Sequence, residues 1–149
     1  FPDVEVLEGT STAGIAHAAL VAERLGLPMG YVRGSHKSHD RQNNIEGAVK
    51  KGMKVVVVED LISTGGSSLE VVEALREAGC EVLGLVAIFT YGLPASVENF
   101  AKANCKFVTL SNYDTLLPVA IAHNYVSHDA LEKLQAWKKD PRDESWLDK

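Results

Sequence analysis

The sequence predicts an α/β domain built on a mostly parallel, twisted sheet that carries helices on both faces. Two observations support this fold class. Strand-like and helix-like segments alternate along the chain, and the strand-like segments are apolar throughout, as in sheets covered on both sides. A length of 149 residues suits one core and argues against a second domain. We therefore expect a single domain over residues 1–139, followed by a charged, frayed tail over 140–149.

The elements follow one another in a regular order. Strands are expected at 4–7, 28–32, 45–49, 54–58, 81–90 and 106–110, and helices at 12–25, 67–78, 95–103, 112–123 and 129–138. Gly26 suits the end of the first helix, where a left-handed residue is common. Residues 34–44 show no hydrophobic period and are expected to form a loop, of a length that often serves function.

Composition narrows the class of protein. Hydrophobic residues make up 46% of the chain and charged residues 23%, which is typical of a soluble globular protein. The net charge of −5 argues against a nucleic-acid surface. Cys80 and Cys105 lack the spacing of metal ligands and suit a reducing cytosol. Without a signal peptide or an apolar run of ~20 residues, we expect a cytoplasmic protein with no membrane partner.

The most informative segment joins a strand of valines to a helix through acidic and then small polar residues. Glu59 and Asp60 follow the valines, and the run Ser63–Ser67 opens the helix. Backbone N–H groups in such a turn can surround an anion, and Gly65 permits close approach. The two carboxylates would repel a phosphate, so we expect them to face ribose hydroxyls or a hydrated Mg²⁺. The implied ligand is a phosphorylated sugar; the alternative is an ordinary strand–turn–helix with a Ser or Thr cap.

This segment resembles the 5-phosphoribosyl 1-diphosphate (PRPP) loop of the type I phosphoribosyltransferases. The resemblance implies the type I phosphoribosyltransferase fold and a site that holds PRPP together with Mg²⁺. No residue is assigned as a direct metal ligand, although the ion would lie near the two acids. The PRPP contacts that the resemblance implies in this segment are Glu59, Asp60, Leu61, Ile62, Ser63, Thr64, Gly65, Gly66 and Ser67.

The loop after the second strand concentrates basic side chains. Arg33, Lys37, His39 and Arg41 lie within nine residues. A mobile basic loop could close over a diphosphate leaving group, neutralise its charge and exclude water. His39 could also donate a proton near neutral pH. The alternative is a solvated charged loop without a role in chemistry.

This loop is similar to the catalytic loop of the orotate phosphoribosyltransferases. The resemblance extends to the segments 31–33, 44–47, 87–92 and 113–116. The resemblance implies transfer of the phosphoribosyl group from PRPP to orotate, giving orotidine 5′-phosphate and diphosphate in de novo pyrimidine biosynthesis. It implies catalytic roles for Lys37 and His39, PRPP contacts by both and by Arg33, and an orotate contact at Ser63. It also implies a homodimer in which the loop Arg33–Asn44 reaches the neighbouring site.

Some features depart from the family pattern. Ala13, Gly34 and Tyr91 stand where other members carry basic residues. The chain also starts at Phe1 directly before a strand, so we expect the N-terminal segment of the family, with much of its orotate pocket, to be missing. Two alternatives remain open: a purine acceptor on the same fold, and a PRPP-sensing regulator that binds nucleic acid. The acidic charge balance counts against the regulator.

Overall fold

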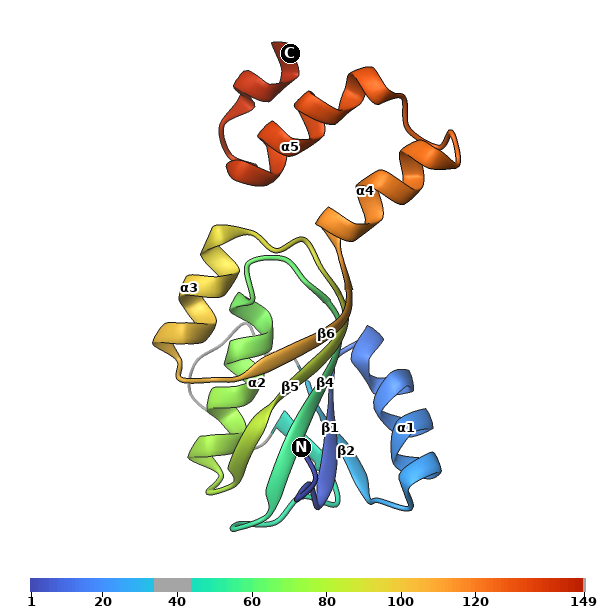
Figure 1. The fold of residues 1–149 in the computed structure, drawn as a ribbon. Coiled ribbons are helices and arrows are strands. Elements are labelled where there is room, and N and C mark those ends of the chain that lie inside the picture. Colours follow the sequence, from blue (N-terminus) through green and yellow to red (C-terminus); the bar gives the residue numbers. More distant parts are fainter. Residues whose placement is uncertain (34–43, 149) are drawn as a thin grey trace.

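The computed structural model describes residues 1–33 and 44–148 and contains a six-stranded sheet in the order β3-β2-β1-β4-β5-β6 (Figure 1). Neighbouring strands run parallel, except that β3 is antiparallel to β2 at one edge. The mostly parallel sheet confirms the predicted fold class. The strands are β1 (Val6–Thr10), β2 (Met29–Val32), β3 (Ile45–Gly47), β4 (Lys54–Ile62), β5 (Glu81–Thr90) and β6 (Phe107–Asn112).

Helices cover both faces of this sheet. Figure 1 shows α1 on one face and the pair α2 and α3 on the other, whereas α4 and α5 lie beyond the end of the sheet where its parallel strands finish. We call that end the carboxyl edge. The helices are α1 (Ala13–Leu25), α2 (Gly66–Glu77), α3 (Pro94–Lys102), α4 (Tyr113–Ala122) and α5 (Leu131–Lys139), with short 3-10 turns η2 (His128–Ala130) and η3 (Glu144–Asp148). Within the described residues, no helix has the length and apolar character needed to cross a membrane.

The valines of β4 explain why the sheet needs helices on both sides. Side chains alternate between the two faces of a strand. Val55 and Val57 belong to the apolar cluster that contains Leu75 of α2. Val56 packs in a second cluster with Ala18 of α1. The run of consecutive valines therefore contributes to two cores at once.

Two strands continue further than the sequence suggests. We expected the first strand to end at Leu7 and the central strand at Val58, but β1 continues to Thr10 and β4 to Ile62. Strand pairing is the reason. Gly9 of β1 is in register with Val58, and β5 accompanies β4 to its last residue. The acidic and small residues that resemble turn signals are therefore part of the ladder.

The C-terminal segment is more ordered than expected. Residues 144–148 form the turn η3 instead of a frayed tail. Lys133 of α5 donates a hydrogen bond of 2.9 Å from Nζ to the carbonyl oxygen of Leu147. The same ammonium lies 5.8 Å from the centre of the Trp146 ring. These contacts of a single lysine fold the last residues back onto α5.

Candidate active site at the carboxyl edge

The topology of the sheet marks one position for a ligand. From β1 the sheet extends through β2 and β3 in one direction, and from β4 through β5 and β6 in the other. In open sheets of this kind, ligands bind outside the carboxyl ends of the strands where the order reverses. Here that position lies between β1 and β4, and the helices that follow these two strands, α1 and α2, both begin there.

Both helices start without a side-chain cap. The residue before α2 is Gly65, which has a φ of 83° and no side chain to accept a hydrogen bond. Thr12, before α1, makes no side-chain cap hydrogen bond either. The alternative of an ordinary Ser or Thr cap is therefore wrong for α2. Two helix N-termini at adjacent strand ends leave backbone N–H groups and positive dipole ends for two anionic groups.

Neighbouring elements hold the loop before α2 in place. The carbonyl oxygen of Ile62 accepts hydrogen bonds of 3.2 Å from the Thr90 hydroxyl and from the backbone N–H of Tyr91. Asn99 of α3 donates a hydrogen bond of 3.0 Å to the carbonyl oxygen of Thr64. A Cβ built on Gly65 would lie 2.5 Å from the Phe100 ring. The loop is thus fixed from two sides, as preorganised anion binding requires.

Residues of the predicted PRPP loop differ in their access to a ligand. Ser63, Gly66 and Ser67 are exposed, and Thr64 is half-buried. Beside Gly66 the space is open, because a Cβ built there has only the Thr64 hydroxyl within 4 Å, at 3.9 Å. Ile62, by contrast, is fully buried in the apolar core. Its contribution to ligand binding would be limited to its backbone.

Glu59 lies inside the protein. Its side chain is 7% exposed, and its carboxylate accepts hydrogen bonds from the hydroxyls of Thr10 (2.5 Å) and Ser68 (2.8 Å) and from the N–H of Asp60 (3.1 Å). Burial raises the pKa of Glu59 above its usual range, and the two hydroxyl donors oppose that shift. The carboxylate joins β1, β4 and α2, so a ribose contact by Glu59 stays a prediction.

Asp60 occupies a different position from its neighbour. Strand alternation starts the Asp60 side chain on the other face of β4. Its carboxyl group nevertheless reaches Glu59, because burial and then a side-chain hydrogen bond with Asp60 raise the pKa of Glu59. Asp60 is half-buried. The sequence suggested that both acids point at one ligand. Asp60 is the more accessible of the two acids, and its contact with ribose hydroxyls stays a prediction.

The β1–β2 flank brings Arg33 to this edge. Ser11 donates a hydrogen bond of 2.8 Å from its hydroxyl to the carbonyl oxygen of Val32. The Arg33 guanidinium lies 2.8 Å from a carboxylate oxygen of Glu46. Lys37 and His39, predicted to act on the leaving group, lie outside the described residues, so their roles stay predictions.

Sequence reasoning missed one buried acid, Glu8. It is fully buried, and neither of its carboxylate oxygens has a hydrogen-bond partner among the described residues. Burial raises the pKa of Glu8 to about 8. The carboxylate lies over Gly30 of β2, where any Cβ would collide with Oε1. The available signal was a lone acid between apolar strand residues, which we interpreted as the end of the strand.

On the opposite flank, α5 returns to the end of β5 through an aromatic cluster. The ring of Trp137 lies 5.2 Å from that of Tyr91 and 5.4 Å from that of Tyr113. Phe89 contacts Tyr91 edge-on at 5.7 Å. Such tilted and edge-on pairs stabilise aromatic clusters. The cluster ties the C-terminal helix to the carboxyl edge.

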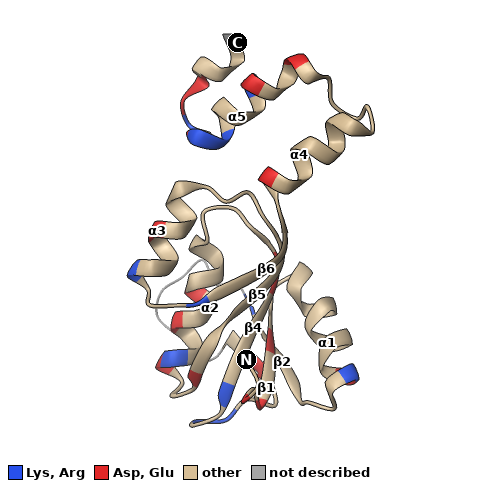
Figure 2. Cartoon of the chain, in the orientation of Figure 1, with Lys and Arg blue, Asp and Glu red and all other residues tan. Residues whose placement is uncertain are grey.

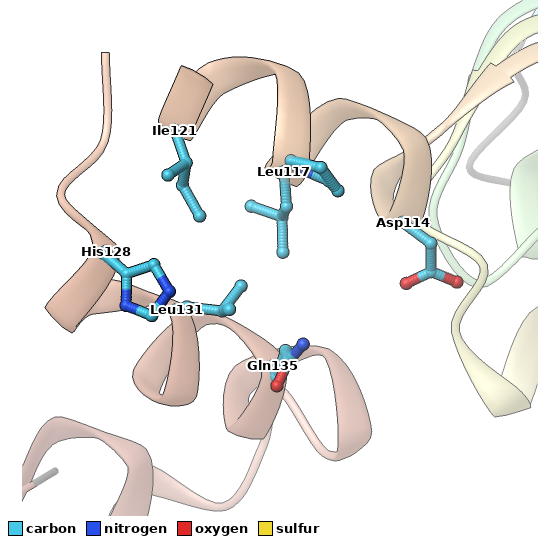
Figure 3. A pocket seen from close by; sticks show the side chains of 7 residues that line it. Asp114, Leu117, Ile121, His128, Leu131 and Gln135 are labelled. Atoms are coloured by element: carbon cyan, nitrogen blue, oxygen red, sulfur yellow. The ribbon is translucent and has the colours of Figure 1, made fainter. Parts of the chain in front are cut away.

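A separate hollow of about 500 Å³ lies between α4 and α5 (Figure 3). Leu117 and Ile121 face Leu131 across it, and His128 and Gln135 supply polar groups at its border. None of the residues that line it belongs to the predicted site. The hollow is formed by the C-terminal helices and the short turn between them.

Comparison with known proteins identifies the family. The phosphoribosyl transferase domain family matches residues 5–117. An orotate phosphoribosyltransferase of Bacillus pumilus is 58% identical over 148 residues, which are 99% of this chain and 70% of that protein. The crystal structure of orotate phosphoribosyltransferase from Aeropyrum pernix is 30% identical with a TM-score of 0.71, covering 83% of this chain and 67% of the other.

A further similar structure is a complex with PRPP. It is the orotate phosphoribosyltransferase of Mycobacterium tuberculosis in complex with PRPP, 26% identical with a TM-score of 0.65, covering 76% of this chain and 66% of the other. The sequence match and the structural match therefore agree with each other and with the geometry at the carboxyl edge. The chain belongs to the orotate phosphoribosyltransferase family of enzymes.

Proposed function

We propose that this chain transfers the phosphoribosyl group of PRPP to orotate, giving orotidine 5′-phosphate and diphosphate in pyrimidine synthesis. The 5′-phosphate would lie at the start of α2, against the N–H groups of Gly66 and Ser67. The diphosphate would lie at the start of α1. The observation that carries this proposal is the pair of uncapped helix N-termini at the ends of adjacent strands. The two helices follow the adjacent strands β1 and β4, and this arrangement suits a sugar with an anion at each end.

The residues around the sugar suit displacement at its anomeric carbon. Glycosyl transfer of this kind passes through an oxocarbenium-like transition state with positive charge on the ring. Asp60 would accept hydrogen bonds from the ribose hydroxyls and favour that charge. Glu59 would support Asp60 from inside, because its carboxylate already accepts the N–H of Asp60 at 3.1 Å. The task of this chain is mostly electrostatic and positional.

Mg²⁺ suits this donor set as an ion carried with PRPP. Mg²⁺ prefers carboxylate and phosphate oxygens and keeps several of its waters. Asp60 offers one carboxylate at the edge, whereas Glu59 is occupied by internal hydrogen bonds. Among the described residues, no group of three or more acidic, Cys or His side chains could hold a metal. The diphosphate and ribose oxygens would therefore supply most of the ligands.

Leaving-group stabilisation would come from the basic loop and the end of β2. Arg33, Lys37 and His39 would neutralise the departing diphosphate, with Lys37 and His39 acting in catalysis. We further propose a homodimer in which the loop Arg33–Asn44 reaches the neighbouring site. Supporting this, α1 exposes Leu20 (69%) and Leu25 (59%), apolar surface of the kind that interfaces cover. Unpaired, buried Cys80 and Cys105 suit a cytoplasmic protein.

The two alternatives make different predictions. A purine phosphoribosyltransferase would share the PRPP site and differ in its acceptor. A PRPP-sensing regulator would retain RNA or DNA, and this binding would weaken steeply as salt rises. The similar proteins from Bacillus pumilus and Aeropyrum pernix are orotate phosphoribosyltransferases, which favours orotate as the acceptor. The acidic net charge of −5 disfavours the regulator.

One experiment separates these outcomes. The protein encoded by the complete reading frame is incubated with PRPP and Mg²⁺ and offered orotate, uracil, adenine or guanine. We expect nucleotide formation with orotate alone, and its loss when Mg²⁺ is chelated. Preferential use of a purine would overturn the acceptor while leaving the PRPP site standing. An absence of transfer to every base, with tight retention of RNA, would favour the regulator.

A further inference from the structure

Orotate carries a carboxylate, so the acceptor pocket needs a cation that PRPP does not already occupy. The acceptor approaches the anomeric carbon opposite the leaving group. If the diphosphate lies on the β1 side at the start of α1, the acceptor lies on the β5 side. The predicted acceptor contact, Ser63, agrees with that placement, because it follows Ile62 at the end of β4 beside β5.

The corner at the end of β5 is well defined. The N–H of Tyr91 donates a 3.2 Å hydrogen bond to the carbonyl oxygen of Ile62, which immediately precedes Ser63. The N–H of Gly92 donates a 3.0 Å hydrogen bond to the Thr90 hydroxyl. The end of β5 at Tyr91 is therefore bonded directly to the residue that precedes Ser63, the predicted acceptor contact.

A lysine of α5 reaches this corner. A Cβ built on Gly92 would lie 3.5 Å from the Nζ atom of Lys138 and 3.6 Å from its Cε. The neighbouring Trp137 packs on Tyr91, which fixes that turn of the helix. Figure 2 shows the basic end of α5 lying toward the sheet. The Lys138 side chain is 21% exposed and pairs with Asp114 at 2.5 Å.

We propose that Lys138 is a specificity-determining residue that holds the carboxylate of orotate. An ammonium group has three N–H donors, and the pair with Asp114 uses one of them. The half-buried position strengthens the attraction for a second carboxylate relative to a solvated surface lysine. Asp114 is 71% exposed, so water solvates its charge and limits its competition. The inference rests on the proposed function and names the group that would select orotate over uracil.

A simpler role for the same contact is mechanical. The ion pair between Lys138 and Asp114 joins α5 to the start of α4, and it could serve only to fix the C-terminal helices. The two roles differ in what they predict for Asp114. A mechanical clamp is lost when either partner is neutralised. A carboxylate site is lost only with the lysine, and it gains from removal of the competing aspartate.

The test therefore compares Lys138→Gln with Asp114→Asn, which break the same ion pair. Orotate, uracil and PRPP are each titrated calorimetrically, and transfer is assayed with orotate and with uracil. We expect Lys138→Gln to weaken orotate binding about ten- to a hundredfold, as loss of a charged hydrogen bond does. PRPP affinity should not change, and uracil should remain unused as an acceptor. Asp114→Asn should leave orotate binding equal or tighter, and Lys138→Arg should keep most of the preference for orotate.

The results distinguish a carboxylate site at Lys138 from a mechanical clamp. Equal weakening of orotate binding by Lys138→Gln and Asp114→Asn overturns the inference in favour of the clamp, as does an unchanged orotate affinity in folded Lys138→Gln. If Lys138→Gln fails to fold, weaker orotate binding by folded Asp114→Asn still overturns it, and tighter binding supports it. Failure of the unaltered protein to bind PRPP or use orotate would instead refute the proposed function.

Discussion

The Thr10 hydroxyl lies 2.5 Å from a carboxylate oxygen of Glu59, so the last residue of β1 is bonded to β4 at the edge where the ligand is proposed to bind. Ser68, in the first turn of α2, donates to the other oxygen of the same carboxylate at 2.8 Å. All three side chains are at least nine-tenths buried. One internal acid therefore fixes the positions of two strands and a helix N-terminus relative to one another.

Replacing Thr10 by Val should destabilise the fold. The change removes one donor and leaves a Glu59 oxygen poorly satisfied, a loss of about 1–3 kcal/mol in the free energy of unfolding. Denaturant unfolding would measure it. Thr115→Val is a matched control, because Thr115 is exposed on α4 and the hydrogen bond that it donates to Asn112 comes from its backbone N–H. Equal stability of the two variants would show that the Thr10 contact contributes little.

Glu8 should make stability depend on pH in a direction opposite to that of a salt-bridged acid. Burial raises its folded pKa from 4.5 to about 8. Between these values the folded state keeps a proton that the unfolded state has released, so the free energy of unfolding falls as pH rises. The loss is about 1.4 kcal/mol per pH unit. Stability from this group is fully present below pH 4.5 and is lost as pH rises through about 8.

Glu8→Gln should remove this component, because an amide of the same shape does not titrate. Thermal or denaturant unfolding between pH 5 and about 8 would show a flatter stability profile in the variant. The exposed Glu70 of α2 provides the matched control, since Glu70→Gln should keep the wild-type slope. Parallel profiles for wild type and Glu8→Gln would contradict a neutral Glu8 in the folded protein.

Two adjacent glycines should respond differently to substitution. Gly66 has open space at its Cβ position, so Gly66→Val should fold and yet fill the position of the 5′-phosphate, abolishing PRPP binding. Gly65 has a φ of 83° and faces the Phe100 ring at 2.5 Å, so Gly65→Ala should instead lower stability. Calorimetry with PRPP and thermal unfolding separate the two effects. Normal PRPP affinity in folded Gly66→Val would rule out the phosphate position.

Lys37 should affect turnover more than binding. If it neutralises the leaving group, Lys37→Ala should lower kcat strongly at saturating PRPP and orotate while PRPP affinity falls little. If its loop serves the neighbouring site, a mixture of Lys37→Ala and Asp60→Asn subunits should recover part of the activity. Normal kcat in Lys37→Ala would refute the catalytic role, and failed recovery would point to self-contained subunits.

The sequence predicted the architecture well because hydrophobic periodicity decides it. The valines of β4 and the apolar length of β5 required helices on both faces, and the structure has them. Strand ends were predicted poorly. Glu59 and Asp60 resemble the end of a strand, yet pairing with β5 carries β4 on to Ile62. Tertiary pairing overrides local propensity at such positions.

The chemistry of the site was only partly accessible to sequence reasoning. The small polar run before α2 was recognised from its composition, but a sequence does not show that Glu59 is satisfied from within. Lys138 lies 47 residues after Tyr91, and the packing of Trp137 on Tyr91 together with the ion pair to Asp114 brings it to the end of β5. Contacts across such separations depend on how the last helices return to the sheet.

The antiparallel edge strand has a consequence for the evolution of this chain. The N–H of Arg33 donates a 2.8 Å hydrogen bond to the carbonyl oxygen of Asn44, which joins the two ends of the segment 34–43 at the edge of the sheet. An excursion that leaves and returns at one point can change length without moving the elements that flank it. Each doubling of its length would cost only about 0.6 kcal/mol of closure entropy. A change of length between β2 and β3 would therefore leave the phosphate-binding helices where they are, and its effect would fall on the roles proposed for Lys37 and His39.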